Sequence, residues 1–183
     1  MTRLVALHDH IAAILSQYSH QVLPTLARLV FAGVLVGFFW NSAMTKLGPG
    51  VSGLFLLSPG AYIQIVPGAM MDAGFDPSRI PLALRLVALL GTWAEFVLPF
   101  LVLVGLATRL SALGMIGFIV VMSWVDIHGH GVDAQTAGAL FDRFPGGLIW
   151  DQRALWVLGL LVLVFQGGGP LSADALLRSR RRQ

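Results

Sequence analysis

The chain has 183 residues, of which 56% are hydrophobic and 11% are charged, and its formal net charge is +3. A chain this apolar lacks the charged surface that keeps a protein of this length dissolved, so a soluble monomer is excluded. The chain holds no cysteine, which excludes disulfides, thiolate nucleophiles, iron–sulfur clusters and any cofactor bound through cysteine.

Residues 1–23 carry apolar side chains at helical spacing on one side and polar ones on the other. A helix with this pattern lies in the plane of the membrane interface. The segment lacks the compact apolar core and the cleavage site of a signal peptide, so we expect it in the mature protein. We therefore treat residues 1–23 as an amphipathic interfacial segment.

The first membrane span is predicted over residues 25–46, about 20 residues and long enough to cross a bilayer. Small and polar side chains recur at every fourth position, which forms a narrow stripe for close helix packing. The stripe consists of Gly33, Gly37, Asn41 and Thr45.

A segment rich in Gly and Pro follows at residues 47–76 and is too broken to span. We expect it to lie over the mouth of the helices, half buried in the interface. Asp76 and Pro77 have the form of an N-cap and a first helical residue. They predict a second spanning helix from Asp76 to about Val104.

The third span is predicted over residues 109–128, and a polar, glycine-rich linker follows over residues 129–147. A fourth span is expected over residues 148–165. Ser172 then has the form of an N-cap for a short tail helix over residues 173–177. Together these elements predict an all-α fold, a polytopic transmembrane four-helix bundle, with the membrane domain over residues 24–170.

The tail, residues 171–183, is basic because Arg178 is followed by three consecutive arginines, 180–182. Such a cluster beside an apolar segment is typical of an anchor to anionic lipid. We therefore expect the lipid bilayer, and no nucleic acid, as a partner. Arg3, Arg28 and Arg109 fall on the same side as this tail, which predicts a multi-pass protein of the plasma (inner) membrane with both termini in the cytoplasm.

Glu95 stands in the middle of the second span, where a carboxylate is costly unless it is paired or protonated. Glu95 is either a structural residue that bonds to a neighbouring helix and holds the bundle together, or the centre of a functional site. Lys46 reaches it only if the helices tilt, and otherwise extends to the outer headgroups. The candidate polar pocket consists of Lys46, Arg85, Glu95, Asn41 and Trp93.

Three residues near the outer end of the third span resemble metal ligands, namely Asp126, His128 and His130. The two histidines point to different sides of a helix, and the spacing fixes no third ligand. We therefore predict no metal site, and these three residues are only weak candidates for one. The alternative is that they form the start of an ordinary loop at the membrane interface.

Three stretches in chain order, WNSAMTKLG, WAEFVLPFLVLVGLATRLSAL and GGGPLSADALL, resemble the DoxX family of small four-helix membrane proteins. The similarity covers about residues 28–177. The family is associated with quinone-linked oxidase systems, thiosulfate oxidation, membrane redox complexes and operons for peptide-derived metal binders. On this resemblance the recurring polar positions are Lys46, Glu95, Arg109, Ser172 and Asp174.

Two functions follow as hypotheses. The first is a subunit of a quinone-linked or other electron-transfer system, with quinone as cofactor and a protein partner in a membrane redox or biosynthetic complex. The alternative is a non-enzymatic accessory or carrier that works with a partner protein, for example in biosynthesis or export of a metal-binding product. A proton-coupled transporter would also use Glu95, but the chain lacks the internal repeat of many such proteins.

Overall fold

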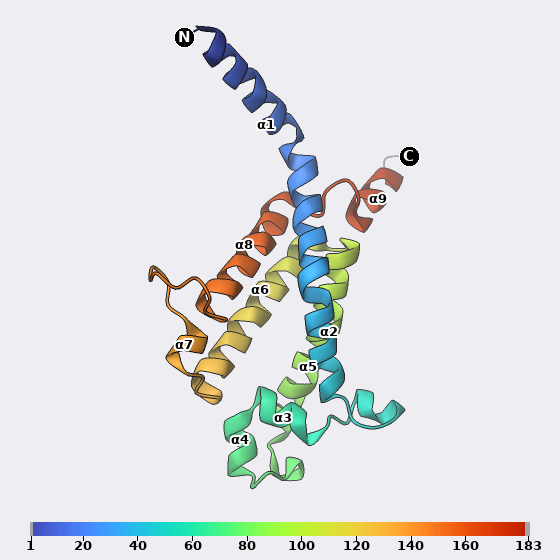
Figure 1. Ribbon diagram of the computed structural model, residues 1–183. Coiled ribbons are helices and arrows are strands. Elements are labelled where there is room, and N and C mark those ends of the chain that lie inside the picture. Colours follow the sequence, from blue (N-terminus) through green and yellow to red (C-terminus); the bar gives the residue numbers. More distant parts are fainter. Residues whose placement is uncertain (1, 182–183) are drawn as a thin grey trace.

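The computed structural model describes residues 2–181, and this part of the chain is folded into helices and connecting turns, as the sequence predicts (Figure 1). No strand occurs within residues 2–181; Leu47 and Leu57 form an isolated antiparallel bridge. Arg182 of the predicted basic cluster lies outside the described residues. The all-helical fold class is therefore confirmed.

The first long helix differs from the prediction because it has no break near residue 23. α1 (Thr2–Phe31), the π-helical turn η1 (Ala32–Val36) and α2 (Gly37–Lys46) follow one another without interruption. Pro24 lies inside this helix, where it removes one backbone donor. Thr25 Oγ1 donates to Gln21 O at 2.8 Å and so adds a local bond in the same turn. How residues 1–23 lie against lipid stays a prediction.

Three helices are long and apolar enough to cross a membrane, over residues 3–46, 82–104 and 108–129. The second is α5 (Leu82–Val104), and the third joins α6 (Thr108–Trp124) to the π-helical turn η4 (Val125–Gly129). Their apolar outer faces need a lipid environment, which identifies the chain as a membrane protein.

The helix expected as a fourth span is α8 (Trp150–Gln166), which has 17 residues, slightly fewer than the roughly 20 that a spanning helix needs. It packs against α6 and α1. The linker before it contains one short helix, α7 (Ala134–Ala137), whose first turn is capped by Asp133.

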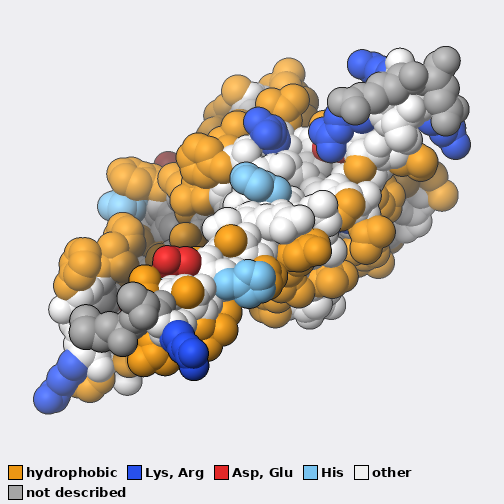
Figure 2. Space-filling model, turned by 90° about the horizontal axis from the view of Figure 1, so that it is seen from above, with side chains coloured by type: hydrophobic (Ala, Val, Ile, Leu, Met, Phe, Trp, Pro, Cys, Tyr) orange, Lys and Arg blue, Asp and Glu red, His pale blue; other side chains and the backbone are white. Residues whose placement is uncertain are grey.

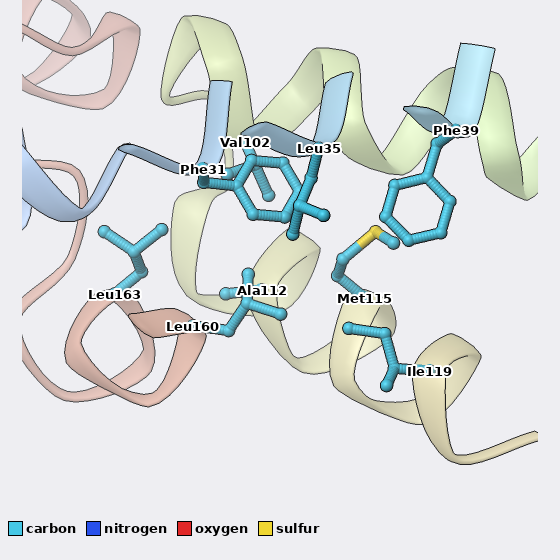
Figure 3. Packing of buried hydrophobic residues seen from close by; sticks show 9 residues of the cluster. All are labelled: Phe31, Leu35, Phe39, Val102, Ala112, Met115, Ile119, Leu160 and Leu163. Atoms are coloured by element: carbon cyan, nitrogen blue, oxygen red, sulfur yellow. The ribbon is translucent and has the colours of Figure 1, made fainter. Parts of the chain in front are cut away.

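The main core lies where these long helices meet (Figure 3). Each helix contributes buried apolar side chains to it, and nearly all of them are at most 3% exposed. The aromatic rings of Phe31 and Phe39 fill the wide spaces, and Ala112 on α6 leaves room for them. The cluster consists of Phe31, Leu35, Phe39, Val102, Ala112, Met115, Ile119, Leu160 and Leu163.

The connection between α2 and α5 folds over one end of the helices, as expected (Figure 1). It contains η2 (Val51–Leu54), α3 (Pro59–Ile65), α4 (Pro67–Asp72) and η3 (Pro77–Arg79). A second buried cluster packs this connection on α5 and consists of Leu57, Ala61, Tyr62, Met70, Ala73, Ile80 and Ala88.

The prediction that α5 begins at Asp76 is wrong. Asp76 accepts hydrogen bonds from the backbone and hydroxyl of Ser78, but the turn it caps ends at Arg79. Pro81 forces Ile80 into an extended conformation, with ψ of 132°, and α5 starts only after it. Burial is slight at Asp76, and the hydrogen bonds from Ser78 hold its pKa below the usual value.

Both termini lie at the same end of the molecule, opposite the α3–α4 connection (Figure 1). The tail helix α9 (Ala173–Arg180) has Ser172 as its N-cap, as predicted, and runs three residues beyond Leu177. Viewed from this end, hydrophobic side chains surround the body, and basic side chains gather near the C-terminal tail (Figure 2). Gly105 ends α5 and Gly167 ends α8, with φ angles of +69° and +82° that favour glycine.

Candidate functional site

Lys46 and Glu95 form an ion pair between α2 and α5. Lys46 Nζ lies 3.0 Å from Glu95 Oε1 and 2.8 Å from Oε2. The side chains are only 3% and 6% exposed. The helices therefore approach closely enough for the pairing that the sequence left open, and the alternative in which Lys46 extends to the headgroups does not apply to this structure.

The rest of the ammonium group is also bonded. Nζ donates to the hydroxyl of Ser42 at 2.7 Å and reaches the Ser42 carbonyl at 3.2 Å. An ammonium group has three N–H bonds, so four oxygens share three donors and the Ser42 carbonyl is the most weakly held. Ser42 is one turn before Lys46 on the same helix face, which explains why the lysine stays folded back along α2.

Local sequence explains where the two charges lie. Lys46 is the last residue of α2. Its backbone carbonyl accepts a hydrogen bond from Ser58 N at 3.0 Å, so the following segment satisfies a carbonyl that the helix end leaves free. Glu95 is on the buried face of α5, together with Ala88, Thr92 and Pro99. Because Pro99 lacks an N–H, it cannot bond the carbonyl of Glu95, which lies four residues earlier.

The other residues of the predicted pocket lie elsewhere. Trp93 is half-buried and donates its indole N–H to Leu54 O at 3.0 Å, so it ties η2 to α5. Arg85 is half-buried, and within residues 2–181 no hydrogen bond or ion pair connects it to the Lys46–Glu95 pair. Asn41 is exposed on the outer side of α2. The structure thus brings together two of the five predicted residues.

A second polar cluster was not predicted, and Arg28 is its centre. This side chain, with the residue 9% exposed, donates to four backbone carbonyls. Two of them, Val102 O and Leu103 O, belong to the last turn of α5, at 3.1 and 2.6 Å. The other two, Gly168 O and Leu171 O, lie in the turn after α8, at 2.8 and 2.7 Å. Arg28 thus satisfies carbonyls that a helix end leaves free.

Asp174 occupies the same end of the molecule and binds the start of α6. Its carboxylate accepts from the backbone of Ala107 and from the backbone and hydroxyl of Thr108, at 2.7 to 2.8 Å. Burial alone would raise the pKa of Asp174, but these hydrogen bonds outweigh it and hold the pKa below the usual value. The resemblance singled out Ser172, Asp174 and Arg109; Ser172 caps α9, and Arg109 is exposed.

Arg28 could have been found from the sequence by the argument that singled out Glu95. It is a charged residue near the beginning of the predicted first span, and such residues need partners inside the protein. The sequence analysis used it only to predict orientation. Its partners are backbone carbonyls, which carry no residue-type signal, so only the need for partners could be predicted.

The weak metal candidates are separated. His128 stacks on Trp124 with ring centroids 3.8 Å apart, His130 approaches Gln64 O at 3.1 Å, and Asp126 pairs with Arg153. Within residues 2–181 no group of three His, Asp or Glu side chains is placed to hold a metal ion. The arrangement serves helix packing and the connection to α3.

Comparison with known proteins gives a partial similarity. An uncharacterized protein of Haemophilus influenzae is 31% identical over 85 residues, which is 46% of this chain and 49% of that protein. The chain therefore spans about half the length of this curated relative. No family model matches the chain, and no solved structure matches it.

Proposed function

We propose that this chain is a subunit of a quinone-linked or other electron-transfer system in the plasma (inner) membrane, with the Lys46–Glu95 pair as its proton-exchanging site. The observation that supports this most is the burial of both charges, at 3% and 6% exposure, between membrane-crossing helices. Ionisable groups at such depth are expensive and typically belong to ligand sites or proton relays.

The chemistry of the pair fits proton exchange. The pair is neutral with the proton on Lys46 and equally neutral with it on Glu95, so transfer between them adds no net charge to a medium of low dielectric constant. Gain or loss of a proton by the pair as a whole changes its charge by one. The pair could therefore hold a proton for an acceptor that arrives at the site.

A quinone headgroup is compatible with these donors. Lys46 shares its three N–H bonds among four oxygens, and the longest contact, 3.2 Å to Ser42 O, is the one that an incoming carbonyl oxygen would replace. When bound, a quinone would accept electrons together with protons. Lys46 would orient its carbonyl, and Glu95 would supply or receive the proton.

The membrane arrangement in this proposal includes α8 as a fourth span, which makes a four-helix bundle of the DoxX type. An even number of crossings agrees with the two termini lying at one end (Figure 1). The arginines of α9 support a cytoplasmic location of that end. Single cysteines test this in a chain that has none: Ser179→Cys should be shielded from outside reagents in intact cells, whereas Gln135→Cys should be labelled.

The decisive experiment measures quinone that copurifies with the chain in mild detergent, by mass spectrometry, for the parent and for Glu95→Gln. The amide keeps the shape and a hydrogen bond to Lys46 but cannot exchange a proton. We expect the variant to fold but to fail to restore the redox activity that is lost when the gene is deleted. Asn41→Gln is the matched control because Asn41 is exposed on α2 and no hydrogen bond of the described residues connects its side chain to the pair. Full complementation by Glu95→Gln would refute the proposal.

A second candidate, a non-enzymatic accessory or carrier, is favoured by the N-terminal part of α1. Residues 3–18 project beyond the other helices and are exposed along their whole length (Figure 1). Their exposed apolar side chains include Leu4, Leu7, Ile11, Leu15 and Tyr18. Deletion of residues 2–18 should release a partner protein but leave the bundle folded, whereas an electron-transfer role centred on Lys46–Glu95 should survive it.

A further inference from the structure

A cavity of about 400 Å³ lies between α6, η4 and α8, and none of its lining residues belongs to the Lys46–Glu95 site. Its size is within the range of sites for small ligands. The walls are formed by apolar and aromatic side chains from both helices and by Leu140 from the linker. Because α6 belongs to a membrane-crossing helix, an apolar molecule can reach this cavity from the lipid.

One wall is flat. The indole of Trp124 and the imidazole of His128 stack with centroids 3.8 Å apart and an angle of 22° between their planes. Trp150, from the start of α8, is a second aromatic lining residue. Aromatic surfaces of this kind favour a planar ring in the ligand.

The polar groups of the cavity are few and carry no net charge. Arg153 donates to Ser123 Oγ at 3.0 Å and forms an ion pair with Asp126. The neutralised guanidinium gives a charged head no electrostatic advantage. Arg153 Nε is nevertheless buried without a hydrogen-bond partner. His128 Nδ1 donates to Trp124 O at 3.2 Å, so the other nitrogen of the neutral ring is an acceptor and not a second donor. The unused Nε–H of Arg153 next to an apolar cavity matches an uncharged acceptor.

The wall formed by the linker is held in place by hydrogen bonds. Leu148 N donates to Thr136 O at 2.9 Å, and Gly147 N donates to Asp151 Oδ2 at 2.7 Å. Asp133 fixes the start of α7 by accepting from Thr136. The cavity is therefore preformed, and a ligand does not have to order this segment.

From these features we infer a second ligand site, between α6 and α8, for an uncharged molecule with a carbonyl-bearing planar head and an apolar tail. The head lies beside Trp124, His128 and Arg153, where its carbonyl accepts from the free Nε–H of Arg153. The tail leaves along α6 and α8 toward lipid. The inference depends on the membrane location of these helices and not on the proposed electron transfer.

The test uses decylbenzophenone, an uncharged ketone that crosslinks to neighbouring C–H bonds under ultraviolet light, with the full chain in mild detergent. We expect crosslinks on α6, η4 and α8, mapped by mass spectrometry. Decyl phenyl ketone should compete at least tenfold better than decylbenzene, which lacks the carbonyl, or decylbenzoate, which is an anion. Equal competition by decylbenzene, or stronger competition by the anion, would overturn the inference.

Two alanines give matched variants. Ala154 lines this cavity and Ala27 lines a separate apolar groove of about 360 Å³ between α1 and α8. Ala154→Phe should fill the cavity and remove the crosslinks, whereas Ala27→Phe should leave them. Arg153→Lys keeps a positive charge for Asp126 but removes the Nε–H, and should weaken competition by the ketone roughly three- to tenfold. Crosslinks that persist in Ala154→Phe would place the probe elsewhere and refute the site.

The carbonyl could belong to a free lipophilic ring compound or to the ester of a membrane lipid. Dioleoylglycerol, an uncharged ester, distinguishes the two sources in the same competition. Displacement at concentrations equal to those of decyl phenyl ketone identifies a lipid ester, and failure to displace identifies a ring ketone. The probes are not redox reagents, so this site can be confirmed even if the Lys46–Glu95 proposal fails, and the reverse also holds.

Discussion

The two polar clusters of this protein use buried charge in different ways. At Lys46 and Glu95 the charges meet each other, side chain to side chain. At Arg28 and Asp174 each charge meets the backbone at a helix end. An ion pair can be replaced as a unit without leaving backbone groups unsatisfied, whereas removal of Arg28 takes a charged donor from four carbonyls at once.

This difference indicates which cluster is free to serve function. Arg28 joins α1 to the end of α5 and to the turn after α8, so its loss opens several contacts that hold the helices together. The Lys46–Glu95 pair connects two helices that an apolar pair could also connect. A costly pair that the fold could replace is the better candidate for a function.

The largest effect is therefore expected at Arg28. Arg28→Met should lower the free energy of unfolding by about 4 kcal/mol, because several buried carbonyls lose charged donors together. Arg28→Lys should recover only part of this, since an ammonium group cannot reach carbonyls on both α5 and the turn after α8 with the fork of a guanidinium. Thermal melting in detergent measures both. A melting temperature for Arg28→Met equal to that of the parent would show that the carbonyls find other donors.

The next largest effect is expected at Lys46. Lys46→Met leaves Glu95 buried without its cation and should cost about 3 kcal/mol. In Lys46→Met/Glu95→Leu both charges are absent, and stability should return to within about 1 kcal/mol of the parent. Chemical or thermal denaturation of the four proteins of this double-mutant cycle measures the coupling.

This cycle would contradict the comparison if the double variant were no more stable than Lys46→Met. The pair would then be as indispensable to the fold as Arg28, and the argument that it is retained for function would fail.

A smaller effect is expected at Asp174, and it should depend on pH. Asp174→Asn removes the charge that caps α6 and should cost about 1 kcal/mol at neutral pH. The pKa of Asp174 is held below its usual value in the folded protein, so the carboxylate stabilises the fold above the pKa of an unfolded aspartate. This contribution is lost as the pH falls through the folded pKa. The melting curves of parent and variant should therefore converge in acid; a constant difference at every pH would contradict the role of the charge.

Much of the fold could be predicted from the sequence because long apolar stretches and Gly or Pro breaks carry strong local signals. The third span and the turn at Gly105 follow from such signals. The start of α5 could not be predicted from Asp76 alone, because a proline five residues later outweighs a correct N-cap. The first helix continues through Pro24 because the proline removes only one backbone hydrogen bond, a loss that the surrounding helix tolerates.

The candidate site was predictable only in part. A carboxylate within an apolar helix identifies Glu95 by its cost, but the distance to Lys46 depends on how α2 and α5 tilt and meet. Asn41 shares a sequence neighbourhood with Lys46, yet five residues of helix turn it toward the outside. The partners of Arg28 are backbone carbonyls from segments more than 70 residues away in sequence, a relation that no local pattern encodes.

The smallest effect is expected at Asn41. Substitutions at Asn41 and at its neighbour Ser42 test which polar residues of α2 belong to the Lys46–Glu95 site. Asn41 is exposed, and within residues 2–181 its side chain makes no hydrogen bond. Asn41→Leu should therefore change the stability of the isolated chain in detergent by less than about 0.5 kcal/mol and, under the proposed function, leave electron transfer intact. Ser42→Ala, one residue further, removes a hydroxyl that Lys46 Nζ binds at 2.7 Å and should cost about 1 kcal/mol. A large effect at Asn41 with none at Ser42 would mean that α2 presents its other face to a functional partner.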